Sequence, residues 1–194
     1  MPEAFRGIEM LPASRLPGQL FVLLHGAGSS DIALLAEKLR AAYPEAAILI
    51  PDGAFPLTPA AVHELVRGAQ DRLNVLPTDT AIAGFSQGAV VALEYSKAHD
   101  GSAGRVLAFS GRYATLPDEA PELATIHLFH GRDDEVMPVE HAWQAYQRLA
   151  ELRGDVTIDI ASNVGHELHA SLVDRAINRL QTCIPLRSWQ RALS

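Results

Sequence analysis

The chain of 194 residues contains a single cysteine, Cys183, which excludes an internal disulfide and a multi-cysteine metal site. It lacks the run of about eighteen apolar residues that a membrane-spanning helix needs, and its first residues lack a charged-then-apolar signal pattern. It also lacks a basic cluster, because its 16 Lys and Arg are scattered and its net charge is −7. Nucleic acids and anionic membranes bind such clusters, so we expect neither as a partner, and we expect a cytoplasmic location.

The composition is that of a soluble globular protein, with 48% apolar and 20% charged residues. A length of 194 residues fits one domain of ordinary size, and no repeat, low-complexity tract or linker divides the chain. We therefore expect a single domain over residues 1–194, with its core at about 19–181 and a C-terminal tail at 185–194.

Strand-like and helix-like segments alternate along the chain. Continuous apolar runs of strand length occur at residues 19–25, 46–50, 104–109, 125–130 and 156–161. Apolar residues at helical spacing separate most of these runs, and this alternation predicts a mostly parallel sheet with helices on both faces. In such a sheet, ligands bind at the carboxyl ends of the strands.

Residues 84–88 read Gly-Phe-Ser-Gln-Gly, a Gly-x-Ser-x-Gly pattern between a strand-like run and a helix-like run. A sharp strand-to-helix turn of this kind strains the central serine and needs glycines on either side to fold back. It presents the Ser86 hydroxyl above the sheet, at the N-terminus of a helix. The pattern therefore indicates a nucleophilic serine.

A serine hydroxyl needs a base within reach, and that base needs an acid to orient it. In sheets of this kind the order along the chain is Ser, then Asp or Glu, then His. The loop after residues 125–130 supplies three acids, Asp133, Asp134 and Glu135, and the loop after the last strand supplies His166. Neighbouring acids point in different directions, so only one of the three meets the imidazole.

The chain has eight histidines, and most have a simpler explanation than catalysis. His127 and His130 lie within a strand, where a hydrogen-bonded structural role is expected. His166 follows Gly165 in a strand-to-helix loop and is the favoured base, while His169, one turn into the next helix, is the alternative. His25 is expected to brace the glycine-rich loop that follows it.

An oxyanion formed during acyl transfer needs preorganised backbone donors. The N–H of Gln87, directly after the serine, is one expected donor. The second is expected from the loop His25-Gly26-Ala27-Gly28, with Ala27 as its residue. This loop has no Gly-x-Gly-x-x-Gly spacing and no Gly-Lys-Ser/Thr ending, which argues against a nucleotide site.

Together these segments resemble the phospholipase/carboxylesterase family of α/β-hydrolases, which includes bacterial cytoplasmic esterases and acyl-protein thioesterases. The resemblance lies in residues 24–28, 84–89, 130–138 and 165–166, and it spans nearly the whole chain. The His-Gly-x-x-Asp-x-Val-x-Pro pattern of the family places its catalytic acid on Asp134. The resemblance implies an α/β-hydrolase fold without a lid domain, and hydrolysis of esters or thioesters through an acyl-enzyme, with no cofactor and no metal.

The chain departs from the family pattern at Ser29, where an Asp is frequent, and in a short connection at residues 51–58. In relatives a longer stretch there walls the acyl site, so we expect a more open pocket. We expect Phe55, Arg112 and Tyr113 to rebuild the wall. Thr58 and Pro59, a cap and a first-turn proline, are predicted to begin the next helix.

The sequence hypothesis is thus a serine hydrolase that cleaves esters or thioesters of small or medium acyl chains with Ser86, His166 and Asp134. The alternative is a non-catalytic binding or regulatory protein on a hydrolase scaffold, since a fold does not determine a function. A small-molecule substrate and a monomer or homodimer are expected.

Overall fold

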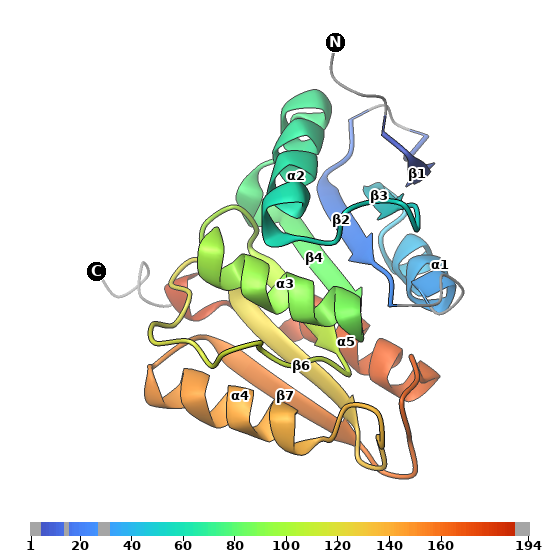
Figure 1. Cartoon of the computed structure of the whole chain (residues 1–194). Helices are drawn as coiled ribbons and strands as arrows, with labels where there is room; N and C mark the ends of the chain where they lie inside the picture. Colours follow the sequence, from blue (N-terminus) through green and yellow to red (C-terminus); the bar gives the residue numbers. More distant parts are fainter. Residues whose placement is uncertain (1–4, 14–15, 27–31, 189–194) are drawn as a thin grey trace.

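A computed structural model describes residues 5–13, 16–26 and 32–188. Its centre is one seven-stranded sheet in the order β1-β3-β2-β4-β5-β6-β7 (Figure 1). The strands are β1 Gly7–Met10, β2 Gln19–Leu24, β3 Ala46–Pro51, β4 Thr80–Phe85, β5 Arg105–Phe109, β6 Thr125–Gly131 and β7 Val156–Ala161. Strands β2 to β7 are parallel to their neighbours and only β1 is antiparallel, so the carboxyl ends of six strands share one edge.

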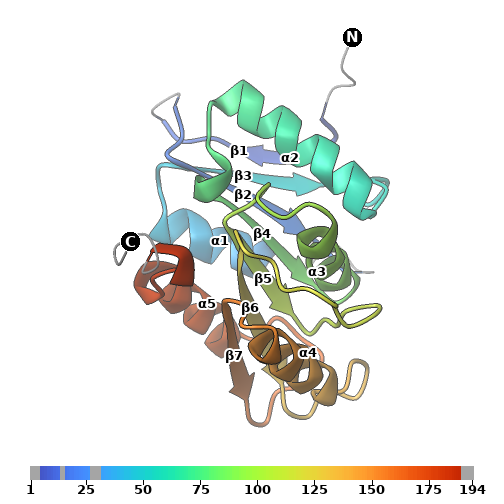
Figure 2. The same ribbon diagram turned by 90° about the vertical axis from the view of Figure 1, so that its left-hand side faces the viewer.

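Helices cover both faces of the sheet (Figure 2). The helices are α1 Ile32–Ala42, α2 Pro59–Leu73, α3 Gln87–Ala98, α4 Glu140–Glu151 and α5 Ala170–Thr182, with a short 3₁₀ turn at Pro77–Asp79. Helices α2, α3 and α4 pack on one face, and α1 and α5 pack on the other. This three-layer arrangement confirms the α/β class predicted from alternating segments, because a strand apolar on both faces must be covered twice.

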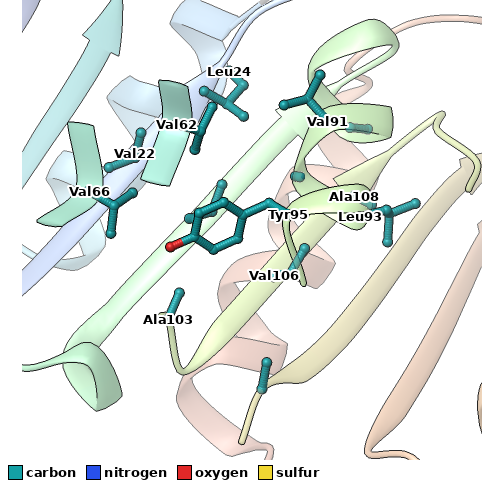
Figure 3. Close-up of a cluster of buried hydrophobic side chains, with 14 of the residues drawn as sticks. Val22, Leu24, Val62, Val66, Val91, Leu93, Tyr95, Ala103, Val106 and Ala108 are labelled. Carbon is teal, nitrogen blue, oxygen red and sulfur yellow. The ribbon is translucent and has the colours of Figure 1, made fainter. Parts of the chain in front are cut away.

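Each face of the sheet has its own apolar core. On the face of α2 and α3, Tyr95 of α3 is fully buried and reaches toward Val62 and Val66 of α2 (Figure 3). On the opposite face, α1 and α5 contribute buried side chains such as Leu35 and Leu172. The parallel strands are therefore packed on both faces, and their hydrogen-bonded register fixes which residues stand side by side at their carboxyl ends.

The predicted elements agree with the structure to within a few residues. Thr58 caps α2, because its side chain accepts a hydrogen bond from the N–H of Ala61 at 3.2 Å, and Pro59 is the first helical residue. One element was missed: β1 is a four-residue, largely exposed edge strand that exists through its pairing with β3. No local apolar pattern marks such a strand.

The longest connection within the described ranges, residues 110–124, runs between β5 and β6 without forming a helix or strand. This connection does not form a lid domain, which agrees with the lidless fold that the resemblance implied. In the same ranges, no helix has both the length and the apolar character needed to cross a membrane.

Candidate active site

Ser86 occupies a strained turn between β4 and α3. Its backbone has φ 53° and ψ −116°, a region that side-chain-bearing residues rarely adopt. A Cβ at Gly84 would lie 2.3 Å from the carbonyl carbon of Gly88, and one at Gly88 would lie 2.1 Å from the carbonyl oxygen of Leu24. The turn therefore closes only with glycine at both flanking positions, as the sequence pattern predicted.

The structure brings Asp134, His166 and Ser86 into one hydrogen-bonded line. His166 Nδ1 lies 2.8 Å from Asp134 Oδ2, and His166 Nε2 lies 3.0 Å from Ser86 Oγ. The carboxylate accepts only, so His166 donates from Nδ1 and presents the Nε2 lone pair to the Ser86 hydroxyl. The Asp134 side chain is fully buried, while the His166 side chain remains 17% exposed and reachable from solvent.

The loops that carry the acid and the histidine are held together by backbone contacts. Asp133 N–H donates to the carbonyl of Val164 at 3.0 Å, and Arg132 N–H donates to that of Ala161 at 2.8 Å. A Cβ at Gly131 would lie 2.3 Å from the Val164 carbonyl oxygen, so a side chain there would push the loops apart. The His166 ring also packs on Phe85, with ring centroids 5.0 Å apart.

Asp134 is surrounded by donors. Its Oδ1 accepts hydrogen bonds from the N–H groups of Val136 at 3.0 Å and Met137 at 2.7 Å. Burial alone would raise the pKa of Asp134, but the Met137 N–H, His166 and the Ser110 hydroxyl outweigh it, so this pKa lies below its ordinary value. Asp134 is thus held ionised, the state that orients a histidine.

His130, at the end of β6, contacts the loop that carries Asp134. It is buried, and its Nε2 lies 2.6 Å from the Met137 carbonyl oxygen and 3.4 Å from Asp134 Oδ2. Burial lowers the pKa of His130, against the raising effects of the Met137 carbonyl and Asp134. His130 therefore has a hydrogen-bonded structural role, as the sequence indicated, and that role is to close the loop around Asp134.

The rival candidates lie elsewhere. Asp133 and Glu135 are exposed, and neither contacts the imidazole of His166 in the described structure. His169 is the N-cap of α5 and bonds to Ser171, 2.8 Å from its hydroxyl. Among the alternatives that the sequence left open, Asp134 and His166 are the acid and the histidine that hydrogen-bond in line with Ser86.

The predicted oxyanion donors can be placed in part. Gln87 is the first residue of α3, where a backbone N–H has no acceptor within the helix. A Cβ at Gly26 would lie 3.2 Å from Ser86 Cβ, so the chain after β2 passes directly beside the serine. Ala27 lies outside the described residues.

His25, directly after β2, contacts two carbonyl oxygens, one after β2 and one after β3. Its Nδ1 lies 2.7 Å from the Gly26 oxygen and its Nε2 lies 3.3 Å from the Asp52 oxygen. These contacts connect the start of the glycine-rich loop at Gly26 to the chain after β3. This is the bracing role expected for His25. A hollow of about 370 Å³ also has His25 in its wall; it lies between β1, α1 and the end of β3 and is mainly apolar.

The three residues predicted to wall the pocket differ in burial. Arg112 is exposed and follows Gly111, which packs against Ala89 in the first turn of α3. Phe55 is half-buried against the apolar core of the α2 and α3 face. The Tyr113 side chain is buried, and the next contacts show where it lies.

Tyr113 is buried in that core, and its hydroxyl lies 3.4 Å from Ser96 Oγ. Ser96 is ten residues beyond Ser86 on α3, about 15 Å along the helix. An aromatic side chain is drawn into apolar packing when a core site is available, and here that site lies far from the serine.

In the part of the chain that the structure describes, no group of three or more His, Cys, Asp or Glu side chains is arranged to hold a metal ion. The groups that the structure brings together at the site are the Ser86 hydroxyl, the His166 imidazole and the Asp134 carboxylate.

Comparison with known proteins identifies the family. The family model of phospholipase/carboxylesterase matches residues 53–184. The chain belongs to this family. Esterase YpfH of Escherichia coli K12 is 34% identical to it, over 91% of this chain and 88% of that protein. Family membership makes the chain an ester hydrolase by class.

Solved structures agree on the α/β-hydrolase fold. Esterase PE8 superposes with a TM-score of 0.81 at 26% identity, covering 92% of this chain and 99% of that one. The Bacillus cereus carboxylesterase superposes with a TM-score of 0.77 at 15% identity, covering 94% and 96%. The family thus shares the sheet on which the Ser86, His166 and Asp134 line is built.

Proposed function

We propose that this family member cleaves carboxylic esters or thioesters through an acyl-enzyme on Ser86, with His166 as the base and Asp134 as its orienting acid. The supporting observation is the continuous hydrogen-bonded line from Asp134 through His166 to Ser86. A serine hydroxyl becomes a useful nucleophile when a neutral imidazole lone pair faces it, and this line provides that arrangement.

The reaction follows from these contacts. Ser86 Oγ attacks the carbonyl carbon of the substrate while its proton moves to His166 Nε2, and the imidazolium is stabilised by Asp134. Collapse of the tetrahedral intermediate expels the alcohol or thiol, which takes the proton from His166. Water then attacks the acyl-enzyme and gives a proton to His166. As the second tetrahedral intermediate collapses, His166 returns this proton to Ser86 Oγ and the acid product leaves.

The negative oxygen of the intermediate needs donors that do not move during the reaction. The N–H of Gln87 is suited to this role because the helix leaves it without a partner. The second donor is proposed to be Ala27, since Gly26 passes beside Ser86.

Preference for small or medium acyl chains stays a prediction from the sequence, because the apolar hollow of about 370 Å³ that borders His25 is lined by neither Ser86 nor His166. Arg112 and Phe55 remain the proposed contacts of the acyl group. A small-molecule substrate, a cytoplasmic location and a monomer or homodimer stay predictions from the sequence.

The assignment of Ser86 is tested with a fluorophosphonate probe and with p-nitrophenyl esters of increasing chain length. We expect the wild-type protein to be labelled and to turn over short esters fastest, and Ser86→Ala to lose labelling and at least about 1,000-fold of kcat/KM. Matched oxygen and sulfur esters of the preferred acyl chain then decide between esterase and thioesterase.

Ser162→Ala is the control, because Ser162 is an exposed serine after β7 with no part in the proposed site. It should behave like the wild type. Equal labelling and turnover in the wild type and Ser86→Ala would exclude the serine mechanism. A folded wild type that is neither labelled nor active would instead favour the non-catalytic alternative.

A further inference from the structure

Ser110 lies in line with Ser86 at the carboxyl edge of the sheet. Phe85, Phe109 and Phe129 are paired across β4, β5 and β6, and the next residue of each strand is Ser86, Ser110 or His130. Ser86 N–H donates to the Phe109 carbonyl at 3.0 Å and Ser110 N–H donates to the Phe129 carbonyl at 2.9 Å. The backbone therefore places Ser110 between the serine and the histidine that closes the acid loop.

Ser110 carries two unfavourable features that folding does not require. Its φ is +48°, where a side chain costs roughly 1–2 kcal/mol and glycine is unstrained. Its side chain is fully buried, yet its hydroxyl makes no hydrogen bond of normal geometry to the described residues. A buried unpaired hydroxyl costs about 1–3 kcal/mol, so alanine or glycine would be the more stable choice here.

Ser110 lies at the strand end that also holds the acid loop, since Phe109 pairs with Phe129 directly before His130, and His130 Nε2 lies 3.4 Å from Asp134 Oδ2. After burial, which raises the pKa of Asp134, the lowering effects come from Met137 N–H, His166 and then Ser110. Asp134 Oδ1 already receives two backbone N–H groups, and Oδ2 receives His166. The buried, unpaired Ser110 hydroxyl is the neutral donor at this strand end, and hydrogen bonds of active sites often tighten only during the reaction.

We propose that Ser110 is a positioning residue, whose hydroxyl donates to the Asp134 carboxylate and keeps it aligned with His166 while the Ser86 proton is transferred. This inference rests on the proposed function of the Ser86 site. The hydroxyl does not touch the substrate; it acts through Asp134.

Two substitutions separate the hydroxyl from the backbone strain. Ser110→Ala and Ser110→Gly both delete the hydroxyl, but only glycine relieves the positive φ. We expect both variants to lose about 10- to 100-fold in kcat/KM for a short p-nitrophenyl ester, as for loss of a hydrogen bond to a charged group. We expect the glycine variant to unfold at the higher temperature of the two.

The pH profile provides a readout that a purely structural role would not move. Without the Ser110 donor, the Asp134 carboxylate interacts more strongly with the protonated imidazole of His166, so the pair of side chains binds a proton more tightly. The acid limb of the kcat/KM profile should therefore shift to higher pH in both variants. An unchanged limb, or wild-type activity in Ser110→Gly, would overturn the proposal.

A double-mutant cycle tests whether Ser110 acts through Asp134. In an Asp134→Asn background, adding Ser110→Ala should cause little further loss of kcat/KM, because the partner carboxylate is gone. The same fold loss in both backgrounds would place the role of Ser110 elsewhere. If Ser86→Ala abolishes turnover but the Ser110 variants keep wild-type turnover, this inference alone is overturned. If the wild type itself shows no turnover, the proposed function is overturned as well.

Discussion

The backbone of Ser86 shows how a single residue stores strain for chemistry. At φ 53° and ψ −116° the serine occupies a region better suited to glycine, and the surrounding glycines and the start of α3 hold it there. Such conformations cost of order 1–3 kcal/mol and persist when packing over-determines them. The strain aims the hydroxyl at His166 Nε2.

A stability measurement can detect this strain. We expect Ser86→Gly to be more stable than Ser86→Ala by about 1 kcal/mol, because relief of the positive φ exceeds the added entropy of an unfolded glycine. Urea unfolding of both variants gives the difference, and neither variant should hydrolyse esters. At Ser162, whose φ is not positive, the order should reverse. A less stable Ser86→Gly would contradict the strain argument.

At the scale of one element, α2 begins after the short connection from β3. The helix starts at the residue that its cap dictates, since Thr58 accepts the Ala61 N–H and Pro59 fills a position whose N–H needs no partner. The start of α2 therefore depends on two side chains, and the shortened loop still ends in a well-formed helix.

Two substitutions in this helix should change stability in opposite directions. Thr58→Ala removes the cap and should lower the free energy of unfolding by about 1 kcal/mol. Gly68→Ala should raise it by about 0.5–1 kcal/mol, because Gly68 lies inside α2 and an added Cβ meets no atom within 4 Å. Thermal or urea unfolding checks both. A loss of stability in Gly68→Ala would contradict the open space that the structure shows around position 68.

At the scale of the whole molecule, the sheet buries a second histidine on β6, three residues before His130. His127 lies within β6 with no exposure, and its Nδ1 is 2.8 Å from Thr157 Oγ1 on β7. Burial, with smaller effects of Arg105 and Arg179, lowers the pKa of His127 to about 3. A neutral imidazole is therefore part of the packed sheet.

This burial predicts a pH-dependent stability. The unfolded chain binds a proton at His127 near its ordinary value of 6.5, whereas the folded protein does so near 3, so stability falls as pH drops between these values. His127→Asn keeps a polar atom for Thr157 but does not titrate. From pH 7.5 to 4.5, urea unfolding should show the wild type losing about 2 kcal/mol more than the variant. Parallel curves would refute the prediction.

The sequence by itself determined the alternating elements, the glycine-flanked serine and the chain order of serine, acid and histidine. These are local features, because turn geometry, caps and apolar periodicity act over a few residues. The same locality explains why β1 escaped prediction: its four exposed residues form a strand only because β3 offers an edge.

Only the tertiary structure decided which groups meet. It placed Asp134, and not its acidic neighbours, against His166, set His130 beside that carboxylate, and buried Tyr113 in the core near Ser96. The physical reason is that burial and hydrogen-bond pairing depend on strand register and on which face of a helix is covered. Those are set by contacts between residues far apart in the chain.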